Sequence, residues 1–272
     1  MKKTDFHDVV EFCDKRKFFI GEGTPTAKIL IIGKECGWNK DLGEPTPENI
    51  KKQAKESVEY NLKCWRNLNG NLEQLKKDAL KSWPNNPTWR NYETLVKSIT
   101  GMKLAKYDFL DYCFITELSQ IGMPYSKHND ITKESVKKRE ELFMHSFFQN
   151  FPVVVMTCGH YPTQEYKFDI ENIFDVEWTK ETKVLSKANY YNVHHGKTKN
   201  GQDKILIHTR QVSCGVTNQL LQDIGKVIRD FLWRTDNDFR WNNGGKDIYE
   251  KFQDDPEFMQ SEEYQNYMNS LK

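Results

Sequence analysis

Long apolar runs are absent from this chain of 272 residues. The longest, residues 29–32 and 153–156, fall far short of the roughly 18 residues that a membrane-spanning helix needs. The first 17 residues include lysines but lack the apolar segment of a signal peptide. The six cysteines are widely separated and form no CxxC pair, which is typical of reduced thiols. These absences predict a cytoplasmic protein that makes no contact with membranes.

An excess of charge of one sign is also missing. The 40 Lys and Arg residues nearly balance the 39 Asp and Glu residues, so the net charge is +1 and no global field attracts nucleic acid. Residues 180–204 are locally basic, with six lysines against Glu181 and Asp203, and with Tyr and His residues between them. Such a stretch could follow a phosphate backbone and stack on bases. A solvated hairpin explains the same pattern equally well.

Four short segments rich in branched and aromatic residues predict buried parallel strands, at 28–33, 112–116, 152–158 and 204–208. Helical patterns lie between them, at 47–62, 71–82, 91–98, 132–150 and 216–232, with Thr132 as an expected N-cap. This alternation predicts an α/β domain with a parallel sheet. We expect a single domain over residues 1–233, enlarged at about 39–88. Residues 234–272 form an acidic, aromatic-containing appendix.

Ligands of open α/β sheets bind at the carboxyl ends of the strands, so the segments that follow the four strands are the candidate sites. They hold Lys34, Glu35 and Trp38 after the first strand, Glu117 after the second, and His208 at the end of the fourth. A structural interpretation exists as well: Lys34 and Glu35 could form an exposed turn, and His208 could be a core histidine. Cys36 is a candidate nucleophile or a buried thiol. His194 and His195 would point to opposite faces of a strand and could not chelate one metal ion.

Motifs for nucleotide phosphates are lacking, because neither GxGxxG after a strand nor GxxxxGK[ST] occurs. Four other segments in order resemble one superfamily, the uracil-DNA glycosylases, and in layout its thermostable iron–sulfur class. They are FFIGEGTPTAKILIIGKECG, YETLVKSITGMKLAKYDFLDYCFITELSQI, ESVKKREELFMHSFFQNFPVVVMTCGHY and KILIHTRQVS. The resemblance covers about residues 13–233, without 39–88 and 161–203. It implies a three-layer α/β/α sandwich with a four-stranded parallel sheet.

The resemblance also implies a base-flipping N-glycosylase, which extrudes a nucleotide and cleaves its glycosidic bond. Carried over by position, His208 matches the histidine that stabilises the leaving base. Lys34 stands in place of the water-handling carboxylate, with Glu35 next to it, and Glu117 stands in place of the asparagine that reads the base. The remaining substrate-binding candidates are Gly33, Gly37, Trp38, Trp89 and Arg210. Those for the phosphate backbone are Lys197, Lys199 and Ser213.

The cysteines of the iron–sulfur class are not matched: Cys13 is the only one before the first motif, and Ile121 stands where another is expected. We therefore predict no cluster, no metal and no other cofactor. The replacements fall on the reactive positions, which favours a DNA glycosylase with altered base specificity. Two alternatives remain: a catalytically inactive module that binds nucleic acid or nucleotides, and a small-nucleoside hydrolase that uses Glu35 and His208. The sequence indicates DNA or another nucleic acid as the partner and no particular protein.

Overall fold

A computed structural model describes residues 3–66, 76–77, 80, 86–123, 130–213, 215–236 and 260. The strands are β1 (Glu22–Gly23), β2 (Ile29–Gly37), β3 (Cys113–Met123), β4 (Val153–Met156), β5 (Val176–Ser186), β6 (Asn189–Lys197) and β7 (Asp203–Thr209). The α-helices are α1 (Lys3–Arg16), α2 (Pro47–Arg66), α4 (Pro87–Thr100), α5 (Asp130–Phe143), α6 (Ser146–Gln149), α7 (Ile170–Phe174) and α8 (Asn218–Thr235). Shorter turns are η1 (Lys40–Leu42), η2 (Asp108–Asp111) and the π-helical η3 (Tyr161–Glu165). Most of the predicted 71–82 helix and of the 234–272 appendix lies outside the described residues.

The strands form one mixed seven-stranded sheet in the order β1-β3-β2-β4-β7-β6-β5. The four predicted strands correspond to β2, β3, β4 and β7, which are neighbours and pair in parallel. The α/β class is confirmed. The sheet is not limited to four parallel strands, however, because β1 adds an antiparallel edge and the β5–β6 hairpin extends the other side. This hairpin is the locally basic stretch, and it continues the sheet.

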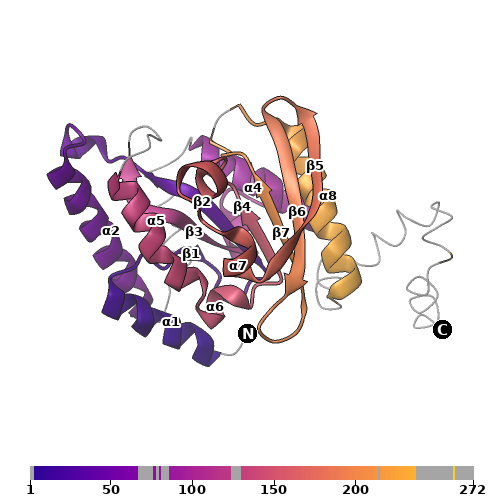
Figure 1. Cartoon of the computed structure of the whole chain (residues 1–272), viewed down its shortest axis with the longest axis horizontal. Helices are drawn as coiled ribbons and strands as arrows, with labels where there is room; N and C mark the ends of the chain where they lie inside the picture. Colours follow the sequence, from indigo (N-terminus) through magenta and orange to yellow (C-terminus); the bar gives the residue numbers. More distant parts are fainter. Residues whose placement is uncertain are drawn as a thin grey trace.

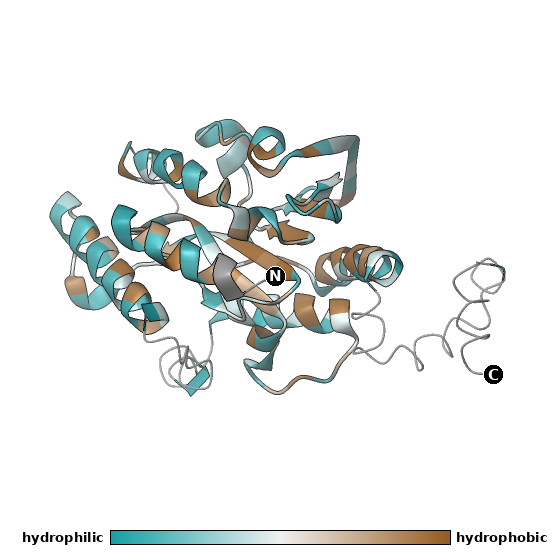
Figure 2. Ribbon diagram, turned by 90° about the horizontal axis from the view of Figure 1, so that it is seen from below, coloured by the Kyte–Doolittle hydropathy of each residue, from teal (hydrophilic) through white to brown (hydrophobic). Residues whose placement is uncertain are grey.

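Helices cover both faces of the sheet, and alternate strand residues supply the two cores (Figures 1 and 2). On β2, Leu30 and Ile32 pack in the core with residues of α1, α2, α5, α6 and α7. Ile29 and Ile31 pack in the core with α4 and α8. Among the helices that the structure describes, none is long and apolar enough to cross a membrane.

Helix boundaries follow local capping signals in part. In α4, Asn86 caps the backbone N–H groups of Thr88 and Trp89, and Pro87 occupies the first turn. In α8, Thr217 Oγ1 accepts a hydrogen bond from Leu220 N at 3.2 Å. The expected N-cap at Thr132 is wrong, because α5 already begins at Asp130 and Thr132 is buried within it. The predicted 132–150 helix is also divided, since α5 ends at Phe143 and α6 begins at Ser146.

Two strands run further than predicted. β2 continues to Gly37 and β3 to Met123, with Gly33 paired to Glu117 and Glu35 to Ser119. Lys34, Glu35 and Glu117 therefore lie in strands, and their expected placement in loops is wrong. Gln53 of α2 holds the end of β2, because it donates to Gly37 O at 2.8 Å and accepts from Asn39 N at 3.0 Å.

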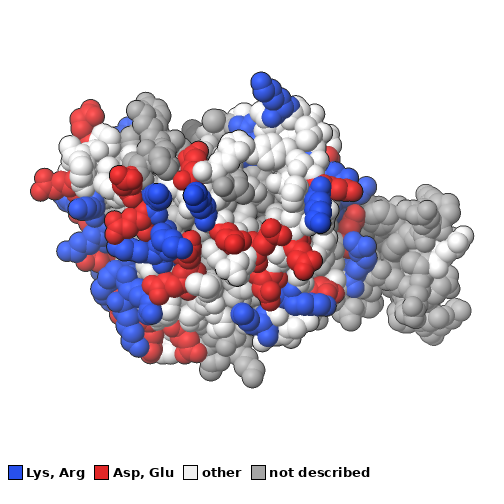
Figure 3. Space-filling view, in the orientation of Figure 1, with Lys and Arg blue, Asp and Glu red and all other residues white. Residues whose placement is uncertain are grey.

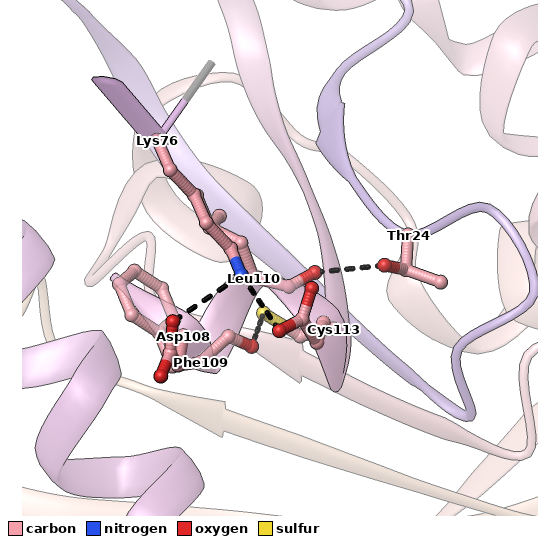
Figure 4. A network of polar contacts seen from close by, with 7 residues as sticks. Thr24, Lys76, Asp108, Phe109, Leu110 and Cys113 are labelled. Carbon is pink, nitrogen blue, oxygen red and sulfur yellow. Dashed lines mark hydrogen bonds and ion pairs between the residues drawn. The ribbon is translucent and has the colours of Figure 1, made fainter. Parts of the chain in front are cut away.

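The start of β3 is fixed by the turn that precedes it, η2. Lys76 Nζ lies 3.3 Å from Asp108 Oδ1 and 2.7 Å from Asp111 Oδ2, while Thr24 Oγ1 donates to Leu110 O at 3.0 Å (Figure 4). The Cys113 thiol donates to Phe109 O. These contacts tie η2 to the β1–β2 connection and to residue 76, so the position at which β3 enters the sheet is fixed.

Arg139 of α5 is fully buried and joins α5 to the middle of β3. Its guanidinium donates to Glu117 O at 2.8 Å and to Thr116 Oγ1 at 3.0 Å. It also donates to Phe19 O at 2.8 Å and to Gln120 Oε1 at 3.2 Å. Burial lowers the pKa of Arg139 to about 10, so it remains a cation at neutral pH.

We expect Arg139→Lys to lower the free energy of unfolding by about 2–4 kcal/mol, because one ammonium cannot reach acceptors placed for a planar fork. Urea denaturation measures this loss. The matched control is Arg16→Lys, at a half-exposed pair with Glu141, where we expect a loss below about 1 kcal/mol. Equal losses at the two positions would show that the Arg139 contacts do not hold β3.

Candidate carboxylate site

Three glutamates gather at one end of the central strands, and we call Glu22, Glu35 and Glu117 the carboxylate cluster. In addition to burial, the charges of Glu35 and Glu22 raise the pKa of Glu117. The charges of all three glutamates likewise raise the pKa of the Cys36 thiol. The Glu117 carboxyl lies over the backbone of Gly33 on the adjacent strand, where a Cβ atom would come 2.1 Å from Glu117 Oε2 and 2.8 Å from the Tyr92 hydroxyl. Only glycine leaves room for the carboxyl, which explains this residue at position 33.

Glu117 carries the most informative electrostatic feature of the site. Burial raises its pKa to about 8, and the negative charges of Glu35 and Glu22 act in the same direction, against Arg139. Arg139 hydrogen-bonds the backbone oxygen of Glu117, and no hydrogen bond to its carboxyl is found within the described residues. The carboxyl is therefore mostly protonated at pH 7 and can donate a hydrogen bond. Burial raises the pKa of Glu22 to about 7.

Glu35 is held by Tyr161, whose hydroxyl donates to Glu35 Oε2 at 2.7 Å. Tyr161 comes from η3, directly after β4, so two strand ends meet at this contact. Lys34 Nζ lies 3.5 Å from the centre of the Tyr161 ring, a cation–π contact. Burial lowers the pKa of Lys34, opposed by the charges of Glu35 and Glu165. Lys34 and Glu35 thus share one aromatic anchor.

The cysteines near the cluster are poor nucleophiles. Burial, reinforced by Glu117 and Glu22, raises the pKa of the Cys36 thiol. The Cys158 thiol donates to Gly33 O at 3.2 Å and to Ile32 O at 3.4 Å, and burial raises its pKa too. A thiolate is the reactive form of cysteine, so both residues have structural roles at neutral pH.

His208 lies on the other face of the sheet. It is in register with Met156 and, through β4 and β2, with Ile32 and Thr116. Glu117 is one residue beyond Thr116, so its side chain points to the opposite face, and three strand spacings separate the two residues by roughly 14 Å. The structure therefore does not bring His208 to Glu117. Glu35, which is held by Tyr161, is not among the groups that shift the pKa of His208, so the pairing of Glu35 with His208 in a small-nucleoside hydrolase stays a prediction.

His208 is 4% exposed, and its Nε2 lies 2.7 Å from Gly159 O. Since a carbonyl only accepts, Nε2 carries the hydrogen. Burial lowers the pKa of His208 to about 4, so the ring is neutral at pH 7. The neighbouring charges that act on it are His194 and His160, not the glutamates of the cluster.

The other substrate-binding candidates make structural contacts. Trp38 donates to Gly43 O at 3.0 Å and packs beside Ile50 of α2. Trp89 packs edge-on against Tyr107 and Phe109, with ring centres 5.7 and 5.9 Å away. Arg210 donates to Ala188 O and Gly215 O, which fixes the chain between β7 and α8. Gly37 is exposed at the end of β2.

The nucleic-acid candidates are divided between the two ends of β7: Lys197 and Lys199 lie at the β6–β7 connection, and Ser213 follows the carboxyl end of β7. Lys197 is exposed and pairs with Asp203 at 2.5 Å, and Lys199 is exposed in the turn. Ser213 is partly buried after β7. Lys204 is excluded from contact with phosphates, because it is 1% exposed and donates to Phe174 O at 2.9 Å. On the face in Figure 3, Lys and Arg side chains are interspersed with Asp and Glu.

No group of three or more His, Cys, Asp or Glu side chains in the described part of the chain could hold a metal ion. His194 and His195 point to opposite faces as expected, since His194 is buried and His195 is exposed. The absence of an iron–sulfur cluster stays a prediction from the cysteine pattern.

Comparisons with protein-family models, with curated proteins and with solved structures found no match to this chain. The resemblance to the uracil-DNA glycosylases therefore stays a prediction that depends on the four sequence segments. The site has to be interpreted from its own geometry.

Sequence reasoning did not find the supporting residues Arg139 and Tyr92. A signal for each was present. Arg139 follows Val136 by three residues, and Tyr92 precedes Leu95 and Val96 by three and four, so both fall on the buried stripe of a helix. A polar group on such a stripe must find a partner inside the protein.

The raised pKa of Glu117 predicts that stability falls as pH rises. A carboxyl whose folded pKa is about 8 binds a proton that the unfolded chain has already lost, so the contribution is lost as pH rises through about 8. We expect the free energy of unfolding to drop by about 1 kcal/mol between pH 7 and 8, and by less in Glu117→Gln. Urea denaturation at both pH values measures the two slopes. Identical slopes in the two proteins would mean that Glu117 is ionised throughout.

Proposed function

We propose that this chain is a uracil-DNA glycosylase-like enzyme that removes a base from DNA, with a base specificity different from that of uracil excision. The observation that carries the proposal is the protonated Glu117 carboxyl over Gly33, beside Glu35, at the carboxyl ends of parallel strands. Ligand sites of α/β sheets lie at such strand ends.

Glu117 suits the role of a base-reading group. Negative charge develops on the departing base when a glycosidic bond breaks, and a preorganised donor at a base carbonyl stabilises it. An ionised glutamate could not donate, but a protonated carboxyl presents one donor and one acceptor, as an amide does. The pKa of about 8 therefore reconciles Glu117 with a position where the resemblance implies asparagine.

Glu35 suits the role of the carboxylate that positions and deprotonates water. The Tyr161 hydroxyl at 2.7 Å fixes one of its oxygens and so orients the group. Lys34 stays beside it as a cation on the Tyr161 ring, where positive charge can stabilise an anionic leaving group. In this scheme water attacks C1′ of the sugar, Glu35 receives a proton of the water, and the base leaves with its carbonyl bonded to Glu117.

A catalytically inactive module that binds nucleic acid or a nucleotide is the second candidate. The position of His208 favours this candidate. His208 is the closest match to a catalytic residue of the family, but its ring is neutral and bonded to Gly159 O, on the opposite face of the sheet from Glu117. In this alternative Ser213, after the carboxyl end of β7, contacts a phosphate near the site, Lys197 and Lys199 contact phosphates at the other end of β7, and the site holds a base without cleaving its bond.

Base release from oligonucleotides separates the two candidates. Single- and double-stranded DNA carrying uracil, hypoxanthine, xanthine or alkylated bases is incubated with the protein, and abasic sites are scored. We expect the protein to release one of these bases. Glu35→Gln should lower the rate of release by about 100-fold or more, and the rate of the unchanged protein should fall above pH 8. Glu117→Gln should retain release at pH 7 and abolish that fall, because the amide still donates.

The matched control is Glu134→Gln, which makes the same chemical change at an exposed pair with Lys138 on α5 and should leave release unchanged. If no base is released while salt-dependent binding to DNA persists, the protein is the inactive module. If neither is observed, both nucleic-acid interpretations are wrong.

A further inference from the structure

A cavity of about 400 Å³ opens on the sheet face opposite Glu117. Its floor consists of Asn192, His194 and His208 on β6 and β7. Its cover comes from the segment between η3 and β5, including Phe168 and α7. Most of its lining thus belongs to residues 161–203, the part of the chain to which the glycosylase resemblance does not extend. Ligand pockets typically have volumes of about 300–1,000 Å³, so this cavity has room for one small molecule.

His194 gives this cavity an unmet hydrogen-bonding group. The side chain is 6% exposed, and its Nδ1 has no hydrogen-bond partner within the described residues. A backbone contact with Leu206 favours the protonated ring, but burial outweighs it and lowers the pKa of His194. In the neutral ring Nδ1 is either a donor or a lone-pair acceptor, and a ligand with the complementary group satisfies it.

The rest of the floor has defined donors and acceptors. Because His208 Nε2 donates to Gly159 O, the second ring nitrogen of the neutral His208 is an acceptor. Asn192 Oδ1 accepts from Thr182 Oγ1 at 2.7 Å, so Asn192 offers its amide N–H groups. The floor therefore presents one imidazole acceptor on His208, the unpartnered Nδ1 of His194 and one amide donor.

The walls and the mouth restrict the ligand further. Phe168 and Trp178 provide aromatic surface, and Trp178 is 39% exposed, so part of its ring is available for stacking. At the mouth, Lys167 lies with Asp169 and Glu171, which gives one net negative charge. Both acids have backbone partners: Asp169 accepts from Asn172 N and Glu171 from Trp178 N. A rigid mouth of this charge disfavours phosphates and other anions.

We propose that this cavity is a second ligand site, which binds an uncharged, planar heteroaromatic molecule of nucleoside size bearing an exocyclic amino group. One amino N–H of such a ligand donates to the His208 acceptor, and the other meets His194 Nδ1 in the tautomer that leaves this nitrogen as an acceptor. An adjacent ring nitrogen accepts from Asn192, and the ring stacks on Trp178. The site lies on the other sheet face from Glu117, and its lining residues other than His208 have no part in the glycosylase proposal.

Isothermal titration calorimetry with adenosine as the probe tests this site in the full chain. Inosine is the matched ligand, because it replaces the amino group by a carbonyl. We expect one adenosine per chain and at least about fivefold weaker binding of inosine, because its carbonyl cannot donate to His208 and its N1–H cannot accept from Asn192. Trp178→Leu should weaken the binding of adenosine by about tenfold or more, because the stacking surface is lost.

His194→Phe keeps an aromatic ring, removes Nδ1 and should weaken the binding of adenosine by about fivefold. The control is Val184→Ala, at a 65% exposed position on the same hairpin and outside the cavity lining, where the affinity should not change. Because Trp178 is exposed, Trp178→Leu keeps the test valid if His194→Phe does not fold. Any of three results would overturn the proposal: no adenosine binding, equal affinity for adenosine and inosine, or adenosine binding that responds to Glu35→Gln but not to Trp178→Leu.

Discussion

The buried guanidinium of Arg139 is the interaction on which the candidate site depends. A buried cation must have its donors satisfied, and here the acceptors come from β3 and from the chain before β1. Two of the contacts, to Thr116 Oγ1 and Glu117 O, fix β3 where it passes beyond the predicted strand end. The Glu117 backbone is thus bonded to a cation, while its carboxyl points to the other face, over Gly33. Burial then outweighs the attraction of Arg139 and holds the carboxyl protonated.

The alternation of side chains in the central strands separates the chemistry of the molecule into two places. Thr116 and Glu117 are adjacent on β3, so their side chains point to opposite faces: Thr116 toward Arg139 and Glu117 toward Tyr92. On β7, His208 falls on the Thr116 side, with the cavity and His194. Glu117 and His208 therefore have different neighbours and opposite pKa shifts. Burial keeps Glu117 neutral by raising its pKa, and it keeps His208 neutral by lowering its pKa.

Much of the scaffold could be predicted from local patterns. The four apolar segments and the helix at 216–232 have strong periodicity, and the structure has β2, β3, β4, β7 and α8 at these positions. The strand ends could not be predicted, because Lys34, Glu35 and Glu117 are charged and read as loop residues. Their strand conformation depends on contacts from distant residues, such as Gln53 to Gly37 and Arg139 to Glu117. The pairing of the β5–β6 hairpin with β7 is likewise non-local, so the sequence indicated a solvated hairpin but not that it continues the sheet.

The protonation state of Glu117 is the central claim, and infrared difference spectroscopy tests it most directly. The carbonyl stretch of a protonated carboxyl is followed against pH in the wild type, and the Glu117→Gln spectrum is subtracted to isolate this residue. The account predicts a protonated Glu117 band that is present at pH 7 and disappears with a midpoint near pH 8. A midpoint near 4.5, the ordinary value for glutamate, would contradict it.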